Sequence, residues 1–430
     1  MCFDSPVWHN GPMPTEDFSA ARLRRALVIK LRHHGDVLLA SPVISTLKHC
    51  APDCEVDALV YADTAPMLEG HPALAQLHLI DRNWKRLGLV RQAAAEWKLI
   101  SALRARRHDL AIHLSVHTRG AWLVRLLRPR WSVAPGFRAG FWANSFTHLY
   151  PAQSDPLRHT VETNLDSLRA LGLEPAAEDK RAVMVPGAQA EARVADLLAR
   201  HGLPTRDFVH VHPASRWAFK CWPAERVAAL CDALAAQGWP IVLSSAPDPN
   251  EKALIAAVCA ARDQGALACR ESCVAGRQSG SPGKQSAPAP TIDLSGQLSL
   301  KELAALTAQA RLFVGVDSAP MHIAAAMGTP VVAIFGPSGD REWGPWGEGH
   351  RVVASTTHPC RPCGMAGCND SKVSNCLTTL PVAQVLAACG ELLATIPPAA
   401  LPGKGVTMVR RAAAPVDGGA ALGRPGGGTA

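Results

Sequence analysis

Short apolar segments alternate with segments of helical periodicity, and this alternation runs twice through the 430-residue chain. Residues 26–32 (ALVIKLR) have the length and composition of a buried strand. Residues 35–51 follow with Leu, Val and Ile three or four positions apart, the spacing of a helix that faces a core. The alternation continues to about residue 127 and restarts at 208–215 (FVHVHPAS). It is typical of βαβ units, which build a parallel sheet covered by helices on both faces.

Two series of similar size predict an α/β chain with two Rossmann-like domains. The polar stretch at 172–189, which contains Pro and Gly, marks the join between them. A Ser-, Gly-, Pro- and Gln-rich segment and a Gly-rich tail predict irregular structure. The expected parts are a disordered segment at 1–23, domains at 24–180 and 181–379, a disordered insert at 269–290, a helix at 380–397 and a disordered tail at 398–430.

Composition is that of a globular protein, with 48% apolar and 19% charged residues. No run approaches the ~20 apolar residues that a transmembrane helix needs. Residues 1–23 contain Asp and Glu and lack an apolar segment, so we expect no secretory signal and an intracellular protein. The net charge of +8 permits an acidic partner such as a membrane face, a phosphorylated sugar or nucleic acid. Solubility alone also accounts for a charge of this size.

Polar residues follow the apolar segment LFVGV at 312–316, and the next helix begins among them. Asp317, Ser318 and His322 lie at this junction, and Pro320 suits a first helical turn. In an open α/β sheet, ligands bind where strands end, and a helix N-terminus there favours a phosphate. The alternative is an ordinary capped helix without a ligand.

The same kind of junction occurs at 32–42 (RHHGDVLLASP). Gly35 permits a close approach of another chain segment. Asp36 lies at or near the start of the helix, where a carboxylate is common as an N-cap. In a cleft between two domains, Asp36 could instead act as a general base.

A third strand end, at 212–227, carries cations. Ser215, Arg216 and Lys220 lie on a loop, and Pro223 stands near the start of the next helix. Two cations at the carboxyl end of a strand suit a pyrophosphate. Ordinary surface charge is the alternative.

Four blocks of the sequence together resemble glycosyltransferase family 9, the bacterial lipopolysaccharide core heptosyltransferases. The resemblance extends over residues 26–396. The block DSAPMHIAAA and the four cysteines between 360 and 376 are most similar to the heptosyltransferase III branch. The blocks are IKLRHHGDVLLASP, HPASRWAFKCWPAERV, the segment 291–338 and WGPWG at 343–347.

This resemblance implies a GT-B architecture, in which an N-terminal acceptor-binding domain and a C-terminal nucleotide-sugar-binding domain face each other across a cleft. It implies an inverting, metal-independent transferase that needs no cofactor. The donor would be ADP-L-glycero-β-D-manno-heptose and the acceptor the lipid A-linked lipopolysaccharide inner core. The protein would be cytoplasmic, with a peripheral contact on the anionic inner membrane, and would have no nucleic-acid partner.

The family's functional residues map onto the three strand ends. Asp36 matches the general base, and Lys220 matches a lysine that contacts the donor and serves catalysis. A carboxylate after the segment PIVLSSA usually holds the ribose, and both Asp248 and Glu251 qualify. Ala319 stands where many members have Gly. The expected donor-binding set is Ser215, Arg216, Lys220, Asp248, Glu251, Asp317, Ser318, Ala319 and His322.

An acidic acceptor would need a basic surface on the N-terminal half. The segment 119–131 supplies arginines interleaved with Trp122 and Trp131, and Trp84, Lys85 and Arg86 add to them. Nucleic-acid binding uses a similar mixture, and a solvated helix face is equally compatible. The expected acceptor-binding residues are Arg119, Arg125 and Arg128.

Four late cysteines have the number of ligands that a structural zinc site requires. Their spacing, C-x2-C-x4-C-x7-C, is not one of the common zinc patterns, so zinc and reduced structural thiols both remain open. The candidate ligands are Cys360, Cys363, Cys368 and Cys376.

Two alternatives to heptose transfer remain. One is a related transferase that uses another nucleotide sugar or a protein acceptor. The other is a nucleotide-sugar-binding protein without catalysis, and the joint presence of Asp36, Lys220 and Asp317 argues against it.

Overall fold

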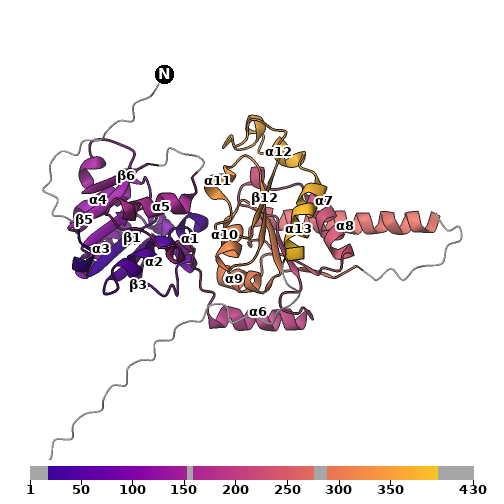
Figure 1. The fold of residues 1–430 in the computed structure, drawn as a ribbon, viewed down its shortest axis with the longest axis horizontal. Coiled ribbons are helices and arrows are strands. Elements are labelled where there is room, and N and C mark those ends of the chain that lie inside the picture. The colour runs from indigo at the N-terminus through magenta and orange to yellow at the C-terminus, as the bar shows by residue number, and fades with distance from the viewer. Residues whose placement is uncertain (1–17, 153–157, 276–287, 396–430) are drawn as a thin grey trace, which may run out of the picture. The chain divides into compact units, whose positions relative to one another are not determined.

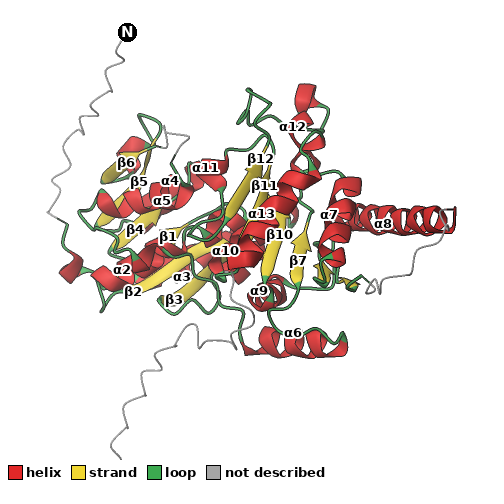
Figure 2. Ribbon diagram, turned by 45° about the vertical axis from the view of Figure 1, so that its right-hand side comes forward, coloured by secondary structure: helices red, strands yellow, loops and turns green. Residues whose placement is uncertain are grey.

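The computed structural model describes residues 18–152, 158–275 and 288–395, and these residues form two parallel sheets (Figures 1 and 2). The first sheet has the strand order β3-β2-β1-β4-β5-β6, and the second has β12-β11-β10-β7-β8-β9. Read from the opposite edge, the second sheet repeats the order of the first. Both have the Rossmann order, so the expected α/β fold class with two Rossmann-like domains is confirmed.

The first sheet is built by the residues that precede the join. Its strands are β1 Arg25–Ile29, β2 Glu55–Tyr61, β3 Leu74–Ile80, β4 Leu110–His113, β5 Trp131–Gly136 and β6 His148–Pro151. Its helical segments are η1 Ala20–Arg22, α1 His34–Leu38, α2 Ser41–Cys50, η2 Ala62–Met67, η3 Arg82–Arg86, α3 Leu89–Arg106, α4 Thr118–Leu127, η4 Ala143–Ser145, α5 Thr160–Arg169 and η5 Glu178–Lys180.

The second sheet follows the same plan. Its strands are β7 Val209–His212, β8 Ile241–Leu243, β9 Thr291–Asp293, β10 Leu312–Val316, β11 Val331–Phe335 and β12 Arg351–Ala354. Its helical segments are α6 Ala188–Arg200, η6 Ala218–Lys220, α7 Ala224–Ala236, α8 Pro249–Ala275, α9 Leu300–Gln309, α10 Ala319–Ala326, α11 Asp340–Trp343, η7 Cys368–Asp370, α12 Asn375–Thr378 and α13 Val382–Thr395.

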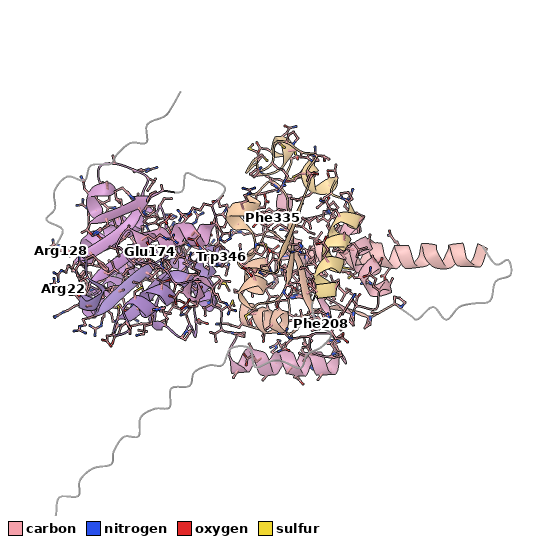
Figure 3. The ribbon with its side chains drawn as sticks, in the orientation of Figure 1. Arg22, Arg128, Glu174, Phe208, Phe335 and Trp346 are labelled. Atoms are coloured by element: carbon pink, nitrogen blue, oxygen red, sulfur yellow. The ribbon has the colours of Figure 1, made fainter. Side chains whose placement is uncertain are left out.

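Apolar strands form the centre of each sheet because helices cover both faces. Every residue of β10 and of β11 is buried, which explains why these segments show no polar alternation. Phe208 and Phe335, labelled in Figure 3, are fully buried. Helix α9 begins with a complete capping box, in which Ser299 and Glu302 each accept a backbone N–H of the other.

Two boundaries differ from the expectation. Residues 18–23 are ordered by η1 and by Phe18, whose ring lies edge-on to Trp131 with centroids 5.3 Å apart. Helix α8 continues to Ala275, into the insert expected at 269–290, because its Ala-rich sequence has high helix propensity. Residues 276–287 of the expected insert, residues 1–17 of the expected N-terminal segment and the tail expected from 398 lie outside the described residues.

The short strands β5, β6 and β12 were not predicted. The expected helix at 380–397 corresponds to α13. Within the described ranges, no helix has both the length and the apolar character that a membrane span requires.

Candidate active site

The three strand-end motifs line one cavity of about 1010 Å³. Residues 32–36, which follow β1, supply the wall from the first domain. Residues 214–220 and 317–322, which follow β7 and β10, supply much of the opposite wall. The cleft between the two Rossmann-like domains is thus lined by loops at the carboxyl ends of strands, where ligands of open α/β sheets bind.

Asp36 is the third residue of α1, and the N-cap position is occupied by His33. The interpretation of Asp36 as an N-cap is therefore wrong. Asp36 lines the cavity and, as a whole residue, is 9% exposed. Within the described part of the chain, its hydrogen-bond partner is Arg32, whose Nε lies 3.4 Å from Oδ1. Most of its lone pairs are thus available to a ligand.

Helix α1 contacts α10 of the second domain through Gly35. A Cβ atom at Gly35 would lie 2.8 Å from Cδ2 of His322, so only glycine fits beside this ring. Burial lowers the pKa of His322 to about 4, which leaves the imidazole neutral near pH 7. His322 thus offers an N–H group, and no positive charge, to a ligand.

Lys220 and Asp317 form an ion pair across the cavity wall of the second domain, with 2.5 Å between Nζ and Oδ2. Ser318 is the N-cap of α10, but its hydroxyl donates to Val316 O at 3.2 Å and caps no N–H. Pro320 has no N–H and the N–H of Met321 donates to Ser318 O at 3.2 Å, so in the first turn of α10 the N–H of Ala319 is left for an anion. Ala319 has no positive φ, so the replacement of Gly causes no backbone strain.

The two candidate ribose carboxylates differ in their surroundings. Asp248 is exposed, and its Oδ1 accepts N–H groups of Asn250 and Glu251 at the start of α8. Glu251 is buried, and its Oε2 accepts the N–H of Ala246 at 2.9 Å. Burial raises the pKa of Glu251. Both residues line the cavity, as do Ser215 and Arg216.

The three arginines expected to bind the acceptor do not line this cavity. Arg119 is paired with Glu96 at 2.5 Å. Arg125 donates to the Ser145 hydroxyl at 2.8 Å and lies over the ring of Phe141. Arg128, labelled in Figure 3, is exposed and ends α4 in a left-handed conformation. The structure does not bring them together with Asp36.

The four late cysteines do not form a compact ligand group. Cys360 and Cys363 are exposed, whereas Cys376 is buried, which raises its thiol pKa. Among the described residues, Asp57, His78 and His108 are the group in which three potential ligand atoms lie within 4.8 Å of one another, and the cysteines are not in it. The four sulfur atoms do not share this geometry, and the zinc site and the reduced structural thiols both stay predictions.

A buried network behind α1 was missed by the sequence analysis. The Lys30 ammonium donates to Leu114 O at 2.9 Å and to Asn164 Oδ1 at 3.0 Å. Asn164 in turn donates to the carbonyl of Leu39, at the end of α1. Burial lowers the pKa of Lys30 to about 8, while nearby Asp36 opposes this shift. A lysine inside the apolar segment ALVIKLR was the available signal.

Trp346, from the block WGPWG, contacts the opposite domain. Its indole stacks on His159 with centroids 4.5 Å apart and donates to Lys180 O at 2.6 Å. Figure 3 labels Trp346. His159 Nδ1 accepts the N–H of Val161, so its Nε2 carries the proton that it donates to Gly344 O. This block therefore joins the two domains next to the cleft.

Comparison with known proteins identifies the family of this chain. The sequence profile of glycosyltransferase family 9 (heptosyltransferase) matches residues 96–374. Lipopolysaccharide heptosyltransferase 3 of Escherichia coli is 33% identical over 368 residues, which cover 84% of this chain and 97% of the relative.

Solved structures show the same GT-B fold. A glycosyltransferase family 9 protein from Veillonella parvula aligns with a TM-score of 0.68 and 21% identity, over 87% of this chain and 99% of its own. The E. coli heptosyltransferase WaaC with ADP-2-deoxy-2-fluoro heptose aligns with a TM-score of 0.61 and 20% identity, over 85% and 99%. The family match, the identity over nearly a whole relative and the two-domain cleft lead to one conclusion: this chain belongs to glycosyltransferase family 9, the heptosyltransferases, and is a glycosyltransferase.

Proposed function

We propose that this protein transfers heptose from ADP-L-glycero-β-D-manno-heptose to the lipopolysaccharide inner core, with inversion at the anomeric carbon and without a metal ion. The observation that carries the proposal is that one cavity has a candidate base on the first domain and a candidate diphosphate site on the second. Asp36 supplies an accessible carboxylate from the first domain, and the second domain supplies Lys220, Asp317 and the start of α10.

The proposed reaction is a single displacement. Asp36 accepts the proton of the acceptor hydroxyl while that oxygen bonds to the anomeric carbon of the heptose. The bond from this carbon to the diphosphate oxygen breaks, and its electron pair leaves with ADP. A base on one domain and a leaving-group site on the other place attack and departure on opposite faces of the sugar, which inverts the anomeric centre.

Protein groups meet the charge that develops on ADP. Lys220 and Arg216 supply cations, and the first turn of α10 supplies the N–H of Ala319. Phosphate oxygens that bind Lys220 would replace its ion pair with Asp317. The Asp317 carboxylate would then accept hydrogen bonds from sugar hydroxyls. Neutral His322 adds an N–H donor beside Asp36.

We assign the ribose to Glu251 rather than to Asp248. One oxygen of Asp248 is committed to the start of α8, and the side chain is exposed. Glu251 is held in place by Ala246 N on the cavity wall. An E. coli structural neighbour carries ADP-2-deoxy-2-fluoro heptose, which is consistent with an adenosine diphosphate donor here.

The lipopolysaccharide acceptor follows from the relatives' activity and from the positive charge of the chain. Among the predicted acceptor residues, Arg128 keeps an exposed guanidinium, whereas Arg119 is ion-paired and Arg125 is hydrogen-bonded. Their contact with the acceptor remains a prediction, as does the cytoplasmic location at the inner membrane.

The decisive experiment incubates the purified protein with ADP-heptose and a core acceptor that lacks the heptose, followed by mass analysis. We expect a mass gain of one heptose, and retention of that gain after treatment with EDTA. Titration with ADP, UDP and GDP should show preference for ADP. A product with UDP- or GDP-sugars, or with a protein acceptor, would instead support the related-transferase alternative. Metal analysis of the same preparation tests the zinc hypothesis.

A further inference from the structure

The surface formed by η3, α3 and α4 exposes large apolar side chains. Leu89 is 87% exposed and Val90 84%, at the start of α3. Trp97, seven positions after Val90 and hence on the same helix face, is 69% exposed. Trp122 on α4 is 58% exposed. We call these four residues the apolar patch; α3 packs against α4 in the domain coloured indigo to magenta in Figure 1.

Cations surround the apolar patch. Five exposed Lys and Arg side chains at 85–104 have no acidic partner within the described part of the chain. Glu96, the one acidic residue between 82 and 106, is paired with Arg119. The local charge is therefore strongly positive. The exposed cations are Lys85, Arg86, Arg91, Lys98 and Arg104.

We propose that this surface, residues 85–104 together with Trp122, docks onto an anionic lipid bilayer. Leucine and valine this exposed gain free energy by entering the acyl boundary, while Lys and Arg bind the anionic headgroups. Tryptophan rings prefer the interface between the two. A nucleic acid would be bound mainly by aromatic stacking and cations, which leaves Leu89 and Val90 without a role.

The docking surface is connected to the proposed base. Segment η3 follows β3 at the same edge of the sheet from which Asp36 emerges after β1. Arg82 donates to the carbonyl of Arg32 at 3.0 Å and to Asp63 at 3.0 Å. A bilayer on this surface would bring a lipid-anchored acceptor to the Asp36 side of the cleft. This functional consequence rests on the proposed function, but bilayer binding itself does not.

The test measures co-sedimentation of the full chain with two kinds of vesicle, phosphatidylcholine alone and phosphatidylcholine mixed with phosphatidylglycerol. We expect binding to the anionic vesicles, weakened by added salt. Val90→Asp should abolish most of it. Aspartate in the first turn of a helix is favourable, so the variant should fold normally. The matched control is Val373→Asp, an exposed valine of the second domain, which should bind like the wild type.

A second variant tests the cations. Lys85→Ala with Arg86→Ala should weaken binding to anionic vesicles by about fivefold for each charge removed. Equal binding of the wild type to both kinds of vesicle, absence of binding, or binding to an oligonucleotide alone would overturn the proposal.

Activity separates this proposal from the proposed function. Val90→Asp should lose turnover on the lipid-linked core in vesicles but keep it on the delipidated, water-soluble core oligosaccharide. Loss of turnover on both acceptors in a folded variant would contradict a docking role. Vesicle binding by a wild type that transfers no heptose would refute the proposed function and leave docking intact.

Discussion

Two aspartates of the first domain lie at opposite edges of the same sheet and are surrounded very differently. Asp57, near the start of β2, is fully buried and accepts from Arg106 at 2.7 and 2.8 Å, from His108 at 2.8 Å and from His78 at 3.4 Å. Asp36, in α1 after β1, borders the cleft, and its hydrogen-bond partner within the described residues is Arg32 at 3.4 Å.

The difference separates a structural carboxylate from one that is available for chemistry. Burial by itself would raise the pKa of Asp57, but hydrogen bonds from His108, His78 and Arg106 outweigh it and hold the pKa well below its usual range. Asp57 and its histidines have the proximity of metal ligands, yet the Arg106 guanidinium already occupies both carboxylate oxygens. Among the residues that the structure describes, Asp36 has no such set of donors, so its carboxylate can accept a proton.

The largest expected effect is that of Asp36→Asn on turnover. Asparagine keeps the shape but cannot take the acceptor proton, so turnover should fall on the order of 10²–10⁴-fold. The melting temperature should change little, since the contact of Asp36 with Arg32 is long, at 3.4 Å. Initial rates and thermal melts measure both. Retention of more than about a third of wild-type turnover would leave Asp36 without a role as a base.

Asp57→Asn should show the opposite pattern. Removing the carboxylate leaves Arg106 without its bidentate partner, so the free energy of unfolding should fall by about 3 kcal/mol. Turnover per folded molecule should stay near that of the wild type. Denaturant titration measures the loss, and Asp63→Asn, which breaks a more exposed ion pair with Arg82 in the same domain, is the control that should lose less than about 1 kcal/mol. Equal losses in both variants would contradict the comparison.

Lys220→Ala tests the donor-binding wall of the cleft, in contrast to Asp36→Asn on the other domain. It removes a cation from the expected diphosphate site, so ADP affinity should fall by roughly 10–100-fold, the usual value of a hydrogen bond to a charged group. Turnover should fall as well. Asp36→Asn, on the other domain, should leave ADP affinity unchanged. Calorimetric titration of both variants with ADP distinguishes them, and unchanged affinity in Lys220→Ala would place the diphosphate elsewhere.

The smallest expected effect is a pH dependence of stability. The folded pKa of Asp57 is depressed below the ordinary value of 3.8. Its stabilisation is therefore complete above that value and is lost as the pH falls from 3.8 towards the folded pKa, where the unfolded chain binds a proton that the folded chain does not. Below pH 4, the free energy of unfolding should fall more steeply with decreasing pH in the wild type than in Asp57→Asn. The two slopes should differ by at most about 1.4 kcal/mol per pH unit. Identical slopes would show that Asp57 does not titrate in this window.

The sequence by itself determined the two Rossmann-like domains and the positions of Asp36, Lys220 and Asp317 at strand ends. These are local properties, because apolar runs and helix entries are encoded by neighbouring residues and parallel strands bring their carboxyl ends to one edge. The weakly apolar strands β5, β6 and β12 were not predicted, since pairing with a neighbouring strand stabilises them.

Only the tertiary structure decided which distant residues meet. It placed Gly35 against His322 and Lys30 against Asn164, and it gathered the partners of Asp57 from two separate segments, β3 and the end of α3. It also left the predicted acceptor arginines outside the cleft and the late cysteines without a shared metal geometry. Contacts of this kind depend on the packing of helices and sheets over long sequence separations, and spacing along the chain carries no information about them.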